Sequence, residues 1–241
     1  SINMRVRKKM TMFTYEEIDE LGDGLMRSYL GDKAGSVLRA DIEGFTENYL
    51  RLPVEYHSFA GNDLDKLGFI SDGVTPLWIN TSGRTVQQIF PKGTIVIEKA
   101  LCHENESGRR RFTLSHESAH FILDKTLSQA KFHREFDSER GYSPDELKEL
   151  FDIRETQVDR MGAALLMPRF MVENVLESEG IDSRIQMFGN GILQAEDKLK
   201  VKRMACRMGV SFTSFLIRLR ELKLIEYRPL NEYIAGMGIN V

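Results

Sequence analysis

The sequence predicts an α+β protein in which a small β-sheet packs on one long helix, followed by a C-terminal helix-turn-helix-like segment. Runs rich in β-branched and aromatic residues, separated by turn residues, are confined to residues 54–98. Stretches with an apolar residue at every third or fourth position lie before and after them. Strands and helices that occupy separate parts of a chain are typical of α+β folds. We expect one domain over residues 1–190 and a helical segment over residues 191–241.

Composition restricts the class of protein. The 241 residues are 41% hydrophobic, which suffices for one sizeable core, and the net charge of -3 argues against a nucleic-acid-binding polycation. No apolar run approaches the roughly 18 residues of a membrane-spanning helix. The basic start lacks the apolar stretch of a signal peptide. Cys102 and Cys206 lie far apart and fit no paired motif, so we expect free thiols, a cytoplasmic location and no membrane association.

The N-terminal part reads as helical. Phe13–Tyr29 has apolar residues at helical spacing, and Thr14 with Glu17 three residues later forms the pattern of a capping box. A second helical segment is expected over about Asp41–Leu50. Both segments are interpreted as core-packing elements.

Five extended segments follow, with the turn Thr81–Arg84 suited to a hairpin. They are Val54–Phe59, Leu67–Ile70, Leu77–Asn80, Thr85–Phe90 and Thr94–Glu98. Thr94–Glu98 has the strongest β-branched character. If it forms the sheet edge beside the site described next, an extended peptide could pair with it.

The central stretch is Arg111–Asp124, RFTLSHESAHFILD, which contains the motif H-E-x-x-H. On a helix, His116 and His120 lie one turn apart on one face, so both imidazoles can reach one metal ion. Glu117 lies beside the first histidine, where a carboxylate can take a proton from a metal-bound water. The alternative is a helix with two surface histidines and a solvated glutamate.

A later helix supplies the missing ligand. Ser143, Pro144 and Glu146 form a helix start, and the helical pattern continues towards Met167 with a break near Asp152. Pro168 stops the helix.

On this helix Glu155 and Asp159 are four residues apart and share a face. Glu155 can complete a His-His-Glu site that leaves a fourth position for water, and Asp159 can accept the second ring N–H of a ligand histidine. Taken alone, both acids could simply face solvent. Together with H-E-x-x-H, they provide what a zincin requires.

Other polar residues are weaker candidates. His57 and the loop Cys102-His103-Glu104 could offer ligands, but we interpret them as ordinary surface residues. A donor for the oxyanion of a hydrolytic reaction is not identified by the sequence. His133 and Tyr142, in the polar segment Lys125–Tyr142, are candidates for it.

Two stretches together resemble the ImmA/IrrE family of metallopeptidases. They are Arg111–His120, RFTLSHESAH, and Glu155–Pro168, ETQVDRMGAALLMP. Family members typically show R-F-T-x-A-H-E-x-x-H and later E-x-x-A-[ND]-x-F-A-x-x-L-L-M-P. The chain departs from these patterns at six positions, none of which is a proposed ligand or the base: Ser115, Ser118, Ala119, Val158, Met161 and Gly162. We expect the departures to affect substrate preference and to leave metal binding intact.

The resemblance implies a zincin-like fold with His116, His120 and Glu155 as zinc ligands and Glu117 as catalytic base. Manganese or iron could replace zinc, since His-His-Glu is not selective by affinity alone. The resemblance also implies a regulatory endopeptidase that cleaves a cognate helix-turn-helix repressor of a phage, mobile element or stress response. The alternatives are a metal-binding regulator that binds DNA or a partner protein with little hydrolysis, and the toxin of a toxin–antitoxin pair.

The C-terminal part, Asp197–Leu222, reads as helix, turn, helix, with the turn pattern A-x-x-x-G-V-S. Before it, Phe170–Glu179 is expected to be a helix and Asp182–Gln194 a loop. From Glu196 to Lys223 there are eight basic and three acidic residues, a surface that could contact phosphates. DNA binding is one interpretation, and packing or docking of the repressor is the other. The pattern identifies no individual DNA-binding residue.

Overall fold

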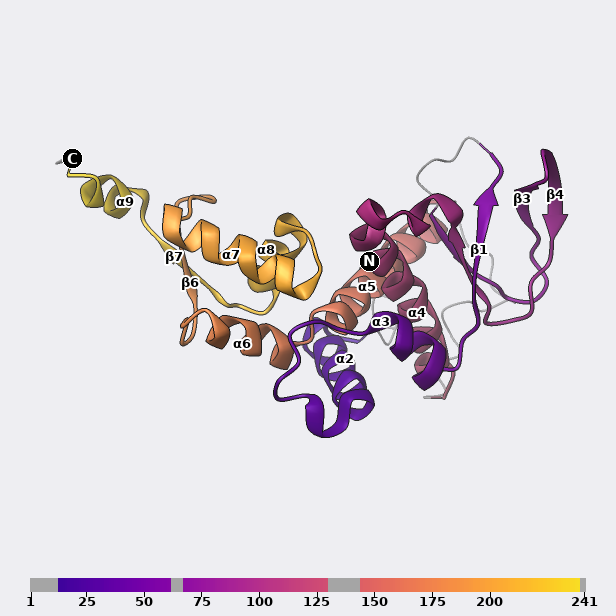
Figure 1. The fold of residues 1–241 in the computed structure, drawn as a ribbon, viewed down its shortest axis with the longest axis horizontal. Coiled ribbons are helices and arrows are strands. Elements are labelled where there is room, and N and C mark those ends of the chain that lie inside the picture. The colour runs from indigo at the N-terminus through magenta and orange to yellow at the C-terminus, as the bar shows by residue number, and fades with distance from the viewer. Residues whose placement is uncertain (1–12, 62–66, 130–143, 239–241) are drawn as a thin grey trace. The chain divides into compact units, whose positions relative to one another are not determined.

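The computed structural model describes residues 13–61, 67–129 and 144–238 (Figure 1). Their contacts divide the chain into two compact units, Ser1–Tyr29 with Asp41–Leu166, and Leu30–Ala40 with Met167–Val241. The chain thus passes from the first unit to the second after Leu166. The predicted domain division at residue 190 stays a prediction. None of the described helices combines the length and apolar content needed to cross a bilayer.

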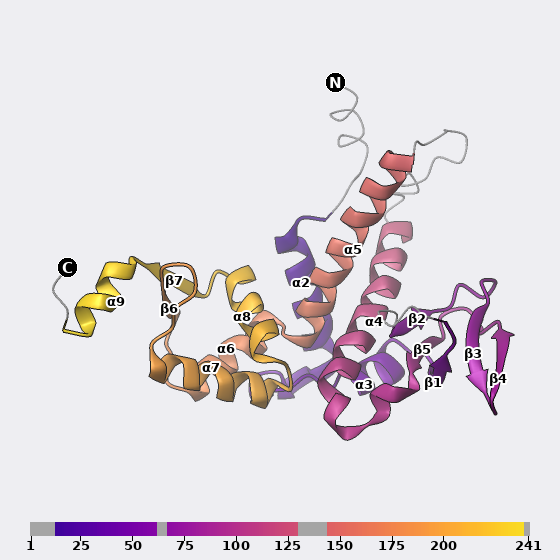
Figure 2. The same ribbon diagram turned by 90° about the horizontal axis from the view of Figure 1, so that it is seen from above.

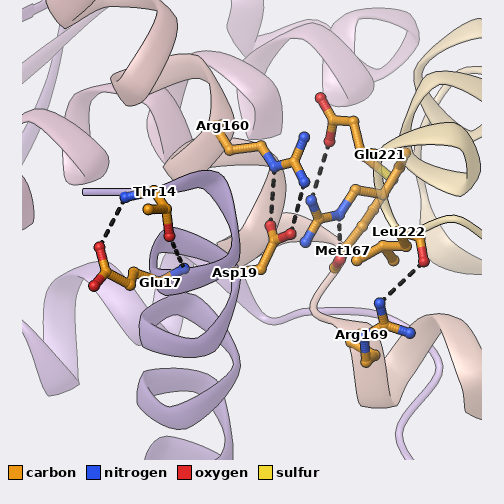
Figure 3. Close-up of polar contacts among 9 residues, drawn as sticks. Thr14, Glu17, Asp19, Arg160, Met167, Arg169, Glu221 and Leu222 are labelled. Atoms are coloured by element: carbon orange, nitrogen blue, oxygen red, sulfur yellow. Dashed lines mark hydrogen bonds and ion pairs between the residues drawn. The ribbon is translucent and has the colours of Figure 1, made fainter. Parts of the chain in front are cut away.

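The first unit begins with helix α2, Tyr15–Leu30. The expected capping box is present: the Thr14 N–H donates to Glu17 Oε2 at 2.8 Å, and the Glu17 N–H donates to Thr14 Oγ1 at 3.1 Å (Figure 3). The next helical segment consists of α3, Ile42–Gly44, and the π-helical turn η2, Phe45–Tyr49.

A mixed five-stranded sheet follows, with the strand order β2-β5-β1-β3-β4. The strands are β1 (Val54–Phe59), β2 (Gly68–Ile70), β3 (Leu77–Thr81), β4 (Arg84–Gln88) and β5 (Ile95–Glu98). β1 and β5 are parallel, and the other neighbouring pairs are antiparallel. The predicted hairpin joins β3 to β4, with Ser82 and Gly83 at positive φ in the tight turn. This sheet and the helices around it confirm the predicted α+β class.

The condition under which Thr94–Glu98 could pair with a peptide, a place at the sheet edge, is not met. β5 is bonded on both sides, to β1 through Val54–Ile95 and neighbouring pairs, and to β2 through Gly68–Ile97 and Phe69–Val96. Its burial follows from this position, since Ile95, Val96 and Ile97 are all fully buried. The outer strand on this side of the sheet is β2.

Helices α4 (Ser107–Gln129) and α5 (Pro144–Leu166) pack side by side, and α4 also contacts β2 and β5 (Figure 2). Two short 3₁₀ turns, η3 (Lys99–Cys102) and η4 (Glu104–Glu106), connect β5 to α4. α5 is continuous, without the break expected near Asp152. The expected cap Ser143 and most of the polar segment after α4 lie outside the described residues.

Helix α2 is held against α5 by an ion pair and by a close helix–helix contact. Arg160 binds Asp19 through two hydrogen bonds, of 3.1 and 2.7 Å, and both side chains are largely buried (Figure 3). Close by, a Cβ on Gly22 would lie 2.6 Å from the Cβ of Ala164. Glycine at this position therefore permits the helices to approach closely.

We expect Gly22→Ala to destabilise the protein. The new methyl overlaps Ala164, and overpacking of this kind costs about 1–3 kcal/mol, against a gain of about 1 kcal/mol in helix propensity. The matched control is Gly24→Ala, two residues along α2, where a Cβ meets open space. Urea unfolding should therefore place Gly24→Ala at or above the wild-type free energy of unfolding, and Gly22→Ala below it. Equal stability of the two variants would contradict the close contact.

The second unit contains four helices and a two-stranded parallel sheet within the described residues. In chain order these are α6 (Arg169–Ser178), β6 (Ile185–Phe188), α7 (Ala195–Met208), α8 (Phe212–Glu221), β7 (Ile225–Arg228) and α9 (Leu230–Gly236). A short 3₁₀ turn, η1 (Gly31–Lys33), also belongs to this unit. The prediction of a loop over Asp182–Gln194 is wrong in part, because β6 lies inside it and pairs with β7.

A three-residue turn joins α7 to α8. Gly209 adopts a left-handed conformation that ends α7, and the Ser211 hydroxyl accepts a hydrogen bond from the Ser214 N–H to begin α8. The expected order of helix, turn and helix is therefore present. Whether this segment acts as a DNA-binding helix-turn-helix stays a prediction.

The basic surface expected on α7 and α8 is smaller than its charge count indicates. Arg218 is completely buried, donating from Nε to the Met167 carbonyl oxygen and from Nη1 to Glu221 Oε2. Figure 3 labels the two acceptor residues, Met167 and Glu221. Arg203 forms an ion pair with Glu179 at 2.7 Å. These two arginines stabilise the second unit, so fewer charges remain to meet phosphates.

Candidate metal centre

Helix α4 presents His116 and His120 on one face, one turn apart. Their rings meet edge to face with centroids 4.9 Å apart, and both side chains are partly exposed. The opposite face of α4 is anchored in the core, where Ser118 Oγ and Thr46 Oγ1 lie 2.8 Å apart in a buried hydrogen bond. The helix is thereby held so that the two histidines face away from the core.

Helix α5 brings Glu155 to both histidines. Glu155 Oε2 lies 3.4 Å from His116 Nε2, and Glu155 Oε1 lies 3.4 Å from His120 Nε2. Asp159, one turn further along α5, lies behind the first histidine, with its Oδ1 3.0 Å from His116 Nδ1. Each nitrogen of His116 thus has its own carboxylate.

These atoms suit a small tetrahedral cation. With zinc–ligand bonds of about 2.0–2.1 Å, two ligands of a tetrahedron lie about 3.3–3.4 Å apart. Each histidine nitrogen lies at this distance from one oxygen of Glu155, His116 Nε2 from Oε2 and His120 Nε2 from Oε1. With one ligand atom taken from each of His116, His120 and Glu155, the three atoms lie within 4.8 Å of one another. Two imidazole nitrogens and one carboxylate oxygen are also ligand types that zinc prefers. The residues present therefore fit a divalent metal ion of this kind.

The surroundings shift the pKa values of the two histidines in opposite directions. Burial lowers the pKa of His116, but the hydrogen bond to Asp159 and the negative charges of Glu117, Asp159 and Glu155 outweigh it, so the pKa is raised above 6.5. Burial lowers the pKa of His120, and the nearby His116 lowers it further, against the charge of Glu155. In the metal-free protein, His116 therefore holds its proton to higher pH than His120 does.

We expect zinc affinity to fall as the pH falls, because the ligand histidines must be neutral to bind metal. The raised pKa of metal-free His116 means that proton competition begins above pH 6.5. Asp159→Asn lowers this pKa, so the fall should move to lower pH, while affinity at high pH drops about 10–100-fold through loss of the carboxylate partner. Chelator competition between about pH 8 and pH 5 measures both effects. An unchanged pH midpoint in the variant would contradict the role of Asp159.

The residues at which α4 departs from the usual family pattern do not face the site. Ser115, Ser118 and Ala119 are completely buried, and Ser115 donates to the Phe112 carbonyl oxygen. Buried side chains cannot touch a substrate directly, and the expectation that these three positions affect substrate preference stays a prediction. Their role is to pack α4 into the core.

The remaining candidates lie apart from this cluster. His57 Nε2 is 2.9 Å from Glu55 Oε2, and its ring packs on Phe90. Cys102, His103 and Glu104 are exposed, and among the described residues the metal-ligand geometry is met by the cluster of His116, His120 and Glu155 alone. His133 and Tyr142 lie outside the described residues.

Sequence reasoning missed two small residues that shape the site, Thr46 and Gly68. Thr46 bonds to Ser118, and Gly68 of β2 lies against Glu117. Neither position carries a motif or an ionisable group, so no local signal indicates it. Glu117 itself is buried, with 8% of its surface exposed, on the side of α4 that faces β2.

Two histidines and a carboxylate that converge, with a further glutamate beside the first histidine, define a site of the metallopeptidase type. The family model of Peptidase_M78, the IrrE N-terminal-like domain, matches residues 49–220 of the chain, which include the whole cluster. The chain therefore belongs to the ImmA/IrrE family of peptidases. A comparison with curated proteins found no match.

Proposed function

We propose that the protein is a zinc-dependent endopeptidase that cleaves a cognate helix-turn-helix transcriptional repressor in the cytoplasm. The observation that carries the proposal is the convergence of His116, His120 and Glu155 at zinc-ligand spacing. Membership of a peptidase family supports hydrolysis of a peptide bond as the reaction.

Each side chain has a separate role in this mechanism. His116, His120 and Glu155 would hold the metal, and Asp159 would orient the His116 ring by accepting a hydrogen bond from its Nδ1–H. A bound zinc ion supplies a water of lowered pKa and a Lewis acid for the scissile carbonyl. Glu117 accepts the proton of the attacking water and delivers it to the leaving nitrogen.

The outer edge of β2 is the docking strand that we propose for the substrate. β2 is bonded to β5 on one side, and it contacts α4, which carries the histidines. An extended peptide can add to such an edge through main-chain hydrogen bonds. Globular proteins rarely offer an extended segment for this pairing, so we expect a narrow specificity for an accessible loop of the target.

The test is cleavage of a purified helix-turn-helix repressor, chosen from the reading frames next to the gene of this chain. The purified chain is stripped of metal with a chelator, reconstituted with zinc, manganese or iron(II), and incubated with the repressor. We expect zinc to restore cleavage at one site, read by mass spectrometry of the fragments. A zinc-loaded protein that binds the repressor or its operator without cutting would instead identify a non-hydrolytic regulator. If expression of the chain arrests cell growth without cleaving or binding the repressor, the protein is a toxin.

A further inference from the structure

Strand β2 carries a glycine at the point where it meets the proposed catalytic base. A Cβ built on Gly68 would lie 2.7 Å from Glu117 Oε1 and 2.9 Å from Glu117 Cγ. It would also lie 2.6 Å from the Cγ2 methyl of Thr113. Gly68 is not in the left-handed region of backbone conformation, so the fold does not need glycine there for its dihedral angles. The glycine instead provides space.

The strand cannot readily move away to make room for a side chain. Gly68 pairs with Ile97 of the buried strand β5, and the Glu98 N–H donates to the Leu67 carbonyl oxygen at 2.8 Å. On the other side, Thr113 and Glu117 project from adjacent turns of α4, and both are buried, with 8% exposed. Of the three atoms nearest to the missing Cβ, Glu117 Oε1 is the one at the far end of a long side chain.

We propose that Gly68 is a positioning residue for Glu117. The space left by its missing side chain is where the Glu117 carboxylate lies, against the main chain of β2. A side chain on residue 68 would turn this carboxylate away from the attacking water. The proposal rests on the proposed function, because it assigns Gly68 to the same reaction.

The first test is Gly68→Ala in the full, zinc-reconstituted chain, with the repressor as substrate. We expect kcat to fall about 10–100-fold, as misplacement of a reacting group by about 1 Å does, with KM little changed. Zinc content should stay at the wild-type level, since the three atoms nearest to a Cβ on residue 68 belong to Thr113 and Glu117 and not to a proposed ligand. Wild-type kcat in Gly68→Ala overturns the proposal.

A second variant separates a moved carboxylate from a loosened strand. Gly68→Ala with Thr113→Ser removes the Cγ2 methyl, leaving Glu117 as the side chain in close contact. We expect this double variant to recover the thermal midpoint of Thr113→Ser alone, while its kcat stays low. Recovery of both stability and kcat would assign the defect to packing of β2 and overturn the positioning role.

The matched control is Gly108→Ala in the first turn of α4, where a Cβ would meet no atom within 4 Å. It should keep wild-type kcat and zinc content. A wild-type chain that binds zinc but cuts nothing refutes the proposed function. A wild-type chain that cuts, with Gly68→Ala equal to it, refutes the inference about Gly68 alone.

Discussion

Glu117→Gln is expected to abolish repressor cleavage while zinc remains bound. The carboxamide has the shape of the carboxylate but cannot accept the proton of the attacking water. Loss of a general base of this kind lowers kcat about 10²–10⁴-fold. Zinc content should not change, because the proposed ligand atoms belong to His116, His120 and Glu155. The measurement pairs a cleavage time course with metal analysis of the same sample.

The control for this variant is Glu104→Gln, which removes the charge of an exposed glutamate just before α4. It should cleave at the wild-type rate. If Glu117→Gln also cleaves at the wild-type rate, Glu117 is not the base and the enzymatic mechanism fails. If Glu117→Gln instead loses zinc together with activity, Glu117 contributes to metal binding. The assignment of Glu117 as a base that leaves zinc binding unchanged would then be wrong.

The pairing of site residues on each helix could be predicted from the sequence, because helical spacing is a local property. His116 and His120 share a face on any regular helix, and so do Glu155 and Asp159. The resemblance of both stretches to one family then indicated that the two helices are neighbours. The structure places Glu155 3.4 Å from each histidine and Asp159 3.0 Å from the first.

The order of the strands could not be predicted in the same way. The β-branched run predicts that Thr94–Glu98 is extended, but whether it is central or at the edge depends on pairing with segments elsewhere in the chain. β2 covers one side of β5, and β1 covers the other. β6 was missed for a related reason, since its partner β7 follows two helices later.

The roles of small residues also could not be predicted from the sequence, because such residues act through the space and the contacts that they give to neighbouring side chains. Gly68 has no chemistry of its own, and its importance appears only when β2 is placed against Glu117. Ser118 read as a departure from the family pattern near the site, yet its partner Thr46 lies 72 residues earlier in the chain, in the core. In both cases the decisive contact is tertiary.

His116→Ala is expected to lower the affinity for zinc about 100-fold, measured by chelator competition beside the wild type. Four-ligand zinc sites contribute apparent free energies of about 10–16 kcal/mol, so one ligand represents about 3 kcal/mol, or about 100-fold in affinity. The variant also leaves Glu155 and Asp159 without the imidazole that separates them, so two carboxylates face one vacated position. The control is His103→Ala, an exposed histidine outside the cluster, which should keep wild-type zinc content.

The size of the effect, compared with Asp159→Asn, distinguishes a ligand from its support. His116→Ala should lower the affinity for zinc more than Asp159→Asn does, at every pH. Cleavage by His116→Ala should fall in proportion to its bound zinc. Equal losses in the two variants would indicate that the ring of His116 acts only when Asp159 fixes it. Wild-type zinc affinity in His116→Ala would show that the metal is held by other residues, and the convergence of α4 and α5 at Glu155 would then need a different explanation.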